Sequence, residues 1–129
     1  YNFGSKFCKR PKKNGEFIHM EGANIFNFTL NEIPKSIYTF LKRNNLNINK
    51  INYFIFHQAN EFIIKSLQKK IKIPDQKIVI DVKSIGNTVS GTIPIILSRN
   101  IRKIQSGKYA LLIGFGVGLS WGVTLIKKN

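Results

Sequence analysis

The chain has 129 residues, of which 43% are hydrophobic, so it can form one domain with a core and is no disordered tail. Its formal net charge of +15 suits an acidic or phosphate-bearing partner, but the basic residues are spread along the chain without a nucleic-acid-binding motif, so we expect no nucleic-acid partner. No apolar run is long enough to span a membrane, and the single cysteine, Cys8, excludes an internal disulfide, so we expect a cytoplasmic protein without a membrane partner.

Residues 1–16 form a basic lead-in that we predict to be irregular, because it contains glycines and a proline and shows little hydrophobic periodicity. Residues 17–129 are predicted to form one domain. Cys8 lies in the lead-in, away from any strand-to-helix junction, so we do not expect it to act as a nucleophile. His19, in the short apolar run that follows, has no matched polar partner nearby and is interpreted as structural.

Two helical segments are predicted next, separated by a proline. The first covers residues 23–30, and Pro34 is expected to interrupt it. A further helical face then recurs at Ile33, Ile37, Phe40 and Leu41.

The stretch Tyr53–Phe56 reads as a buried strand, because continuous apolar runs are typical of parallel sheets that are covered on both faces. The polar residues His57, Gln58 and Asn60 follow at once, and a helix is predicted from Ala59 onward. This polar cluster is therefore expected at the carboxyl end of the strand, where open α/β sheets bind their ligands.

The rest of the chain alternates between strands and helices. We predict a strand at residues 78–80, a loop at residues 81–88 with Asn87 and Thr88 as possible helix caps, and a helix that carries Pro94 in its first turn. A strand at residues 109–113, a glycine-rich turn at residues 114–118 and an antiparallel strand at residues 121–127 complete the chain. The fold class is thus α/β, a mixed and mostly parallel sheet with helices on both faces and a C-terminal antiparallel hairpin.

His57 and Asn87 are separated by one strand-helix-strand unit, so both are predicted at the same end of the sheet. A neutral histidine and an asparagine amide can each present an N–H, and two uncharged donors suit an oxyanion that forms during a reaction. Each residue also has a structural interpretation, as a hydrogen-bonded residue at a strand end or as a helix cap. No nucleophile-elbow serine, metal-ligand spacing or phosphate-binding loop is present, so we expect no metal and no tightly bound cofactor.

Three segments resemble the successive signatures of the C-terminal half of β-ketoacyl-acyl-carrier-protein synthase III. They are His57-Gln58-Ala59-Asn60, Gly86-Asn87-Thr88, and Gly114-Phe115-Gly116-Val117-Gly118-Leu119-Ser120-Trp121-Gly122. The resemblance extends from about Phe17 to the end of the chain, and Met20-Glu21-Gly22 with Phe26 is similar to the segment that enters this half.

The resemblance implies a thiolase-like fold of two similar halves, of which this chain is the second. In such enzymes a cysteine of the first half takes an acyl group from a coenzyme A thioester, which is then condensed with decarboxylated malonyl-acyl-carrier protein in fatty acid biosynthesis. His57 and Asn87 match the positions that stabilise the enolate. The acyl-pocket loop is matched by Phe115, Gly116, Val117 and Gly118. The implied partners are acyl carrier protein, the N-terminal half and, in the full-length enzyme, a second copy.

The sequence departs from the family pattern at two places. Phe62 stands where the well-known synthases carry a basic residue, and Val117 replaces the central glycine of the turn. Lys69 and Lys70 lie on the helix that meets the acidic carrier protein in the family. A related acyltransferase of specialised-metabolite or surface-sugar synthesis and a non-catalytic basic binding module remain alternatives. Because the chain starts at Tyr1 and its only methionine is Met20, we expect it to be part of a longer protein.

Overall fold

The computed structural model describes residues 8–9, 19–116 and 118–129. The elements are β1 (Cys8–Lys9), β2 (His19–Met20), α1 (Gly22–Arg43), β3 (Ile51–Phe56), α2 (Glu61–Ile71), β4 (Ile78–Val79), α3 (Val82–Ile85), α4 (Thr92–Asn100), β5 (Tyr109–Gly116) and β6 (Ser120–Lys127), with short 3-10 turns at Ile48–Lys50, Asp75–Lys77 and Val89–Gly91. Four strands form one sheet in the order β4-β3-β5-β6. β3 pairs in parallel with both β4 and β5, and β6 closes the sheet as an antiparallel strand.

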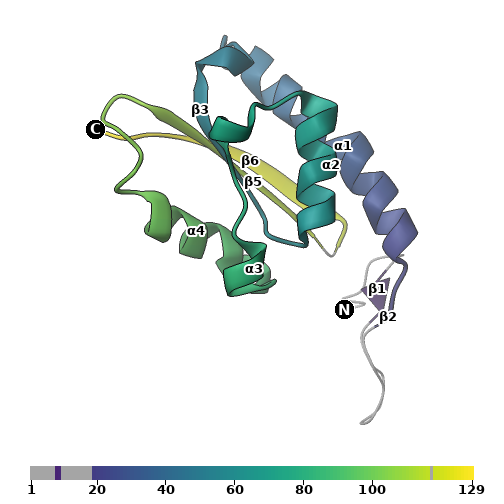
Figure 1. Ribbon diagram of the computed structural model, residues 1–129. Coiled ribbons are helices and arrows are strands. Elements are labelled where there is room, and N and C mark those ends of the chain that lie inside the picture. Colours follow the sequence, from purple (N-terminus) through teal and green to yellow (C-terminus); the bar gives the residue numbers. More distant parts are fainter. Residues whose placement is uncertain (1–7, 10–18, 117) are drawn as a thin grey trace.

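Helices cover both faces of this sheet. Figure 1 shows α1 and α2 side by side on one face, with α3 and α4 on the other. Alternate residues of β3 point to opposite faces, so Phe54 and Phe56 pack with α1 and α2 while Ile55 packs with Ile96 of α4. The predicted α/β architecture, with its buried parallel strand and its C-terminal hairpin, is confirmed.

The predicted break at Pro34 is wrong, because α1 is one continuous helix of 22 residues with Pro34 inside it. Pro34 cannot donate a backbone hydrogen bond, which normally weakens a helix. Here Pro34 is itself buried, and Ile33, Ile37 and Leu41 around it are packed into the core. Burial of this apolar face on α2 and the sheet offsets the missing hydrogen bond.

The C-terminal hairpin is longer than predicted. β5 continues past Ile113 to Gly116, because Gly114 pairs with Gly122 and Gly116 pairs with Ser120 on β6. The glycine-rich segment is therefore mainly strand rather than turn. Gly118 does lie in the turn, where its φ of 133° is a conformation that side chains rarely adopt.

Two other local predictions need correction. The segment 81–88 is not all loop, since it contains the short helix α3, which ends at Gly86 with a φ of 64°. In the lead-in that was predicted to be irregular, Cys8–Lys9 pairs with His19–Met20 as a two-stranded antiparallel ribbon, and residues 1–7 and 10–18 lie outside the described part of the chain. Within the described ranges no helix is both long and apolar enough to cross a bilayer.

Candidate active site

The polar cluster lies where β3 and β4 end side by side. β3 and β4 are parallel neighbours, yet the chain leaves β3 into α2 on one face and leaves β4 toward α4 on the other (Figure 1). In open α/β sheets, ligands bind at the carboxyl edge where neighbouring chains diverge in this way. His57 follows β3, and the loop with Asn87 follows β4 and α3, so both come after the carboxyl ends of neighbouring parallel strands.

His57 is held by three neighbours. Its backbone N–H donates to the Ile113 carbonyl of β5 at 2.8 Å. Its ring meets Phe115 edge-on, with 5.4 Å between centroids and 85° between planes. Its Nδ1 lies 2.6 Å from the Thr92 hydroxyl at the start of α4. The half-buried imidazole is thus fixed from β5 and α4 together, which leaves Nε2 as the ring nitrogen available to a ligand.

Asn87 is connected to His57 through the backbone of Val89 and the side chain of Thr92. The Asn87 side-chain oxygen accepts from the Val89 N–H at 3.0 Å, and the Val89 carbonyl accepts from the Thr92 hydroxyl at 3.2 Å. Because Thr92 also contacts His57, the two predicted donors belong to one hydrogen-bonded chain of residues. With its oxygen occupied, the Asn87 amide has N–H bonds left to offer.

Val89 adopts a strained backbone to make this connection. Its φ is 53°, a left-handed conformation that is uncommon for any residue with a side chain and is a true outlier for a β-branched one. Its side chain is 73% exposed, so burial of the side chain does not compensate for the strain.

We therefore expect Val89→Asn to raise the free energy of unfolding by about 1 kcal/mol, because asparagine tolerates this conformation better. Urea denaturation of the two proteins measures the difference. Val79→Asn, in the regular strand β4, serves as the control and should destabilise the protein. Equal or lower stability of the Val89 variant would contradict the assignment of strain.

Burial lowers the pKa of His57 below its ordinary value of 6.5, and a hydrogen bond to the Val89 carbonyl opposes part of that shift. At neutral pH the ring is therefore uncharged. The unfolded chain binds a proton at a higher pH than the folded chain does, so the free energy of unfolding falls as the pH drops below 6.5.

We expect this loss of stability between pH 7 and pH 5 to be smaller in His57→Gln, which cannot titrate. Urea denaturation at several pH values measures it. Parallel stability curves for the two proteins would show that His57 titrates alike in the folded and unfolded states.

Gln58 links the ends of β3 and β4 by hydrogen bonds. Its side chain is fully buried, and its Nε2 donates to the Phe56 carbonyl at 2.8 Å and to the Val79 carbonyl of β4 at 3.3 Å. Its Oε1 accepts from the Asp81 N–H at 2.9 Å. One amide therefore satisfies three backbone groups at the ends of β3 and β4, where sheet pairing between these strands has stopped.

Asp81 continues this support toward α4. Its carboxylate accepts from Ser84 of α3 and pairs with Arg99 of α4, 2.6 Å away. These contacts, led by the Ser84 hydrogen bond, lower the pKa of Asp81 below its ordinary value. Asp81 thus connects α3, which leads into the loop with Asn87, to α4.

Of the predicted acyl-pocket residues, Phe115 contacts His57, since its ring packs against the imidazole. Gly116 is the last residue of β5, and Gly118 lies beyond it in the hairpin turn. Val117 lies outside the described residues.

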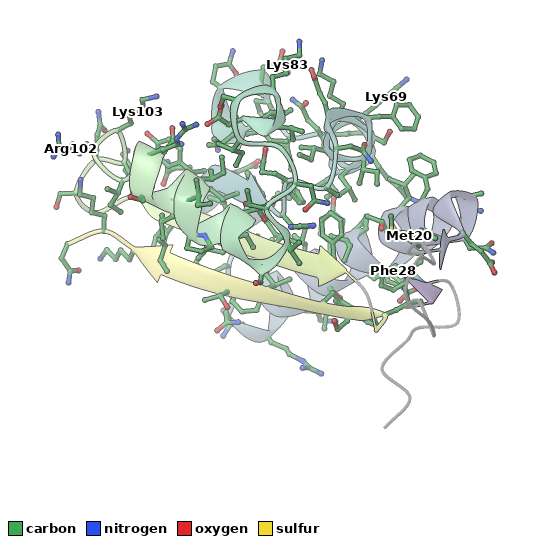
Figure 2. The ribbon with its side chains drawn as sticks, turned by 90° about the horizontal axis from the view of Figure 1, so that it is seen from below. Met20, Phe28, Lys69, Lys83, Arg102 and Lys103 are labelled. Atoms are coloured by element: carbon green, nitrogen blue, oxygen red, sulfur yellow. The ribbon has the colours of Figure 1, made fainter. Side chains whose placement is uncertain are left out.

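The predicted docking lysines are at a distance from this cluster. Lys69 and Lys70 occupy the last turn of α2. That turn lies roughly 12 Å along the axis from the helix start, at a rise of ~1.5 Å per residue. Figure 2 shows Lys69 and Lys83 pointing outward from the molecule. Nζ of Lys83 in α3 lies 3.7 Å from the Glu61 carboxylate at the start of α2.

Phe62 is an exposed aromatic residue near the start of α2. Its side chain is 69% exposed, and its ring stacks on Phe26 of α1 with 5.2 Å between centroids. Phe62 and Phe26 therefore form an apolar pair beside the start of α2, next to the ion pairs of Glu61.

The sequence interpretation missed Thr92 altogether. It is the first residue of α4 and is fully buried, although it is polar. Nothing in the local pattern distinguishes it from an ordinary helix-start threonine, because its partner His57 comes from a different strand-helix unit.

A mixed sheet with this order and helices on both faces, a C-terminal hairpin and a polar cluster after the ends of β3 and β4 define a thiolase-like fold. The chain belongs to the 3-oxoacyl-[acyl-carrier-protein] synthase III family, whose C-terminal family model matches residues 41–128.

Relatives of this family resemble the chain over most of its length. β-Ketoacyl-[acyl-carrier-protein] synthase III of Clostridium tetani is 40% identical over 92% of the chain and 36% of its own length. The crystal structure of synthase III from Pseudomonas aeruginosa has a TM-score of 0.86 at 25% identity and covers 95% of this chain and 40% of that one. The priming β-ketosynthase of the R1128 polyketide pathway has a TM-score of 0.80 at 28% identity, with 86% and 34% covered. The chain thus spans little more than a third of its relatives.

Proposed function

We propose that this chain is the C-terminal catalytic half of a synthase III-like acyltransferase that condenses decarboxylated malonyl-acyl-carrier protein with an acyl thioester in fatty acid biosynthesis. The observation that carries the proposal is the hydrogen-bonded connection between His57 and Asn87 at one edge of the sheet. Two uncharged donors in one cluster match a reaction in which negative charge develops on an oxygen. Membership of the family supplies the reaction class.

In the proposed reaction a cysteine of the N-terminal half first attacks an acyl thioester, and coenzyme A leaves as the thiol. The malonyl thioester then loses carbon dioxide, and the electron pair of the broken bond passes onto the thioester as an enolate. His57 and Asn87 donate hydrogen bonds to the enolate oxygen. The enolate carbon attacks the acyl-cysteine carbonyl, a carbon–carbon bond forms, and the cysteine leaves as a thiolate.

A neutral His57 suits this role better than a charged one. A resting imidazolium would already be solvated or paired, whereas an uncharged N–H gains most of its interaction energy when the oxyanion forms. Burial favours the neutral ring by lowering the pKa of His57. Phe115 is proposed to shape the acyl pocket from β5, together with Gly116, Val117 and Gly118.

The proposed partners are the N-terminal half that carries the nucleophile, an acidic acyl carrier protein and, in the full-length enzyme, a second copy. Lys69 and Lys70 are proposed to attract the carrier through their positive field. Without the N-terminal half, this chain is expected to condense nothing. We expect the enzyme to work in the cytoplasm without a tightly bound cofactor.

A related acyltransferase of a specialised pathway is the second candidate. It is favoured by the likeness to a priming ketosynthase of polyketide synthesis and by Phe62, whose exposed ring replaces a cationic contact. Activity with the carrier proteins and acyl donors of such a pathway would distinguish the two candidate functions.

The test measures carbon dioxide release from malonyl-acyl-carrier protein by the full-length protein that carries this chain. Release that depends on the carrier-bound malonyl group, followed by condensation with an acetyl or longer acyl thioester, is the expected result. Absence of both steps with every acyl donor tried would overturn the proposal. A steeply salt-dependent affinity for nucleic acid in its place would favour a basic binding module.

A further inference from the structure

Three neighbouring strands carry a lysine at the edge of the sheet where the parallel strands begin, which we call the amino edge. Lys50 directly precedes β3 and Lys108 directly precedes β5, and the antiparallel β6 ends there at Lys127. All three side chains are exposed. Because neighbouring strands lie about 4.8 Å apart, these lysines form a row along the amino edge.

The ends of the helices add further cations to this edge. A helix that connects parallel strands runs back across the sheet, so it ends near the start of the next strand. The basic residues at the helix ends are Lys42 and Arg43 in α1, Lys69 and Lys70 in α2, and Arg102 and Lys103 in the turn after α4. Figure 2 shows Arg102 and Lys103 pointing outward, on the far side of the molecule from Met20 and Phe28.

Most of the described carboxylates lie toward the opposite edge. Glu21 and Glu61 lie at the starts of α1 and α2, Asp81 follows β4, and Glu32 lies within α1. Among the described residues, Asp75 in the turn before β4 is the acidic residue on the amino side, and no Asp or Glu follows Asp81 in the sequence. The molecule is therefore electrically polarised, with its positive end away from the candidate active site.

None of the ion pairs in the described chain neutralises the row of lysines. The carboxylates that form these ion pairs are Glu32, Glu61 and Asp81. The end of β6 is held against the turn after α4, since the Lys128 N–H donates to the Lys108 carbonyl at 3.1 Å and its Nζ donates to the Ile101 carbonyl at 2.9 Å. Like charges held together in this way repel one another, and an anionic surface relieves that repulsion.

We propose that the basic edge, formed by Lys50, Arg102, Lys103, Lys108 and Lys127, binds the surface of an anionic lipid bilayer. Clusters of about four to eight Lys or Arg residues are typical of proteins that adsorb to such surfaces. The attraction between cations and a charged bilayer needs no matching shape, so it suits side chains that come from several elements of the fold.

The surroundings of the row favour a bilayer over nucleic acid. Proteins that bind single strands without sequence preference stack the bases on exposed aromatic rings. The tyrosines nearest to the row, Tyr53 and Tyr109, are half-buried, and the Tyr53 hydroxyl donates to the Lys103 carbonyl at 3.0 Å. The exposed apolar neighbour of Arg102 is instead Ile101, an aliphatic side chain that can enter the headgroup region of a bilayer.

Binding through the amino edge would also orient the protein. His57 and Asn87 follow the carboxyl ends of the strands, so they would face away from the bilayer. The inference therefore goes beyond the proposed function and does not depend on it. The expectation of no membrane partner rested on the absence of a spanning run, which adsorption to a surface does not require.

The experiment measures binding of the full-length protein to lipid vesicles by co-sedimentation. Vesicles of equal parts phosphatidylcholine and phosphatidylglycerol should bind the protein at low salt, and vesicles of phosphatidylcholine alone should not. Because the attraction is electrostatic, the bound fraction should decrease steeply as the salt concentration is raised. The triple variant Arg102→Gln, Lys108→Gln, Lys127→Gln should bind at least ~10-fold more weakly.

The matched control carries Lys35→Gln, Lys65→Gln and Lys83→Gln, three exposed lysines away from the amino edge, and so loses the same net charge. It should bind as the parent protein does. An equal loss in both folded variants would show a general effect of net charge and overturn the inference, as would absence of binding by the parent protein. Tighter binding to a single-stranded oligonucleotide than to the vesicles, at equal phosphate concentration, would assign the edge to nucleic acid instead.

Discussion

Replacing His57 or Asn87 by alanine in the full-length protein is expected to slow decarboxylation of malonyl-acyl-carrier protein by ~10²-fold or more. Each substitution removes one N–H from the cluster where the enolate oxygen would lie, and loss of one such donor is expected to cost about 3–4 kcal/mol of transition-state stabilisation. The donors act mainly on the transition state, so the loss should appear in kcat rather than in KM. Initial rates of carbon dioxide release over a range of substrate concentrations measure both constants.

The matched control for Asn87→Ala is Asn44→Ala, because Asn44 is an exposed asparagine that caps the end of α1 and has no hydrogen bond to the polar cluster. It should retain the parental rate. Circular dichroism of all three variants shows whether the fold is kept. A parental rate in folded His57→Ala or Asn87→Ala would defeat the enzymatic assignment of that residue.

The second large effect is on stability, and it concerns Gln58. Replacement by leucine keeps most of the volume but leaves the Asp81 N–H and the carbonyls of Phe56 and Val79 without this side-chain partner. A buried polar group that loses its partner costs about 1–3 kcal/mol, so we expect Gln58→Leu to lower the free energy of unfolding by roughly 2–4 kcal/mol. Urea denaturation measures the change.

Gln76→Leu is the matched control for this variant. Gln76 lies exposed in the 3-10 turn before β4, so the same exchange should alter stability by less than ~0.5 kcal/mol. The Gln58 variant should also lose part of the activity, because the end of β4 would no longer be fixed against His57. If Gln58→Leu lowers the free energy of unfolding no more than Gln76→Leu does, the hydrogen bonds of Gln58 do not stabilise the ends of β3 and β4.

The sequence by itself determined the framework of the site. The apolar run before His57 is typical of a strand whose side chains are buried on both faces of a sheet. The polar residues after it mark the carboxyl end of that strand. The crossover rule then places Asn87 at the same edge. These inferences depend on local periodicity and on chain topology, both of which can be read from residues close together in sequence.

Only the tertiary structure decided how these groups are held. Pro34 stays inside α1 because the residues on either side of it are buried against other elements, and β5 continues through its glycines because β6 pairs with them. Gln58 and Thr92 acquire their positions from contacts across different strand-helix units. Hydrogen bonds between residues far apart in sequence leave no periodic pattern, so the contact between His57 and the Thr92 hydroxyl became visible only when the chain was folded.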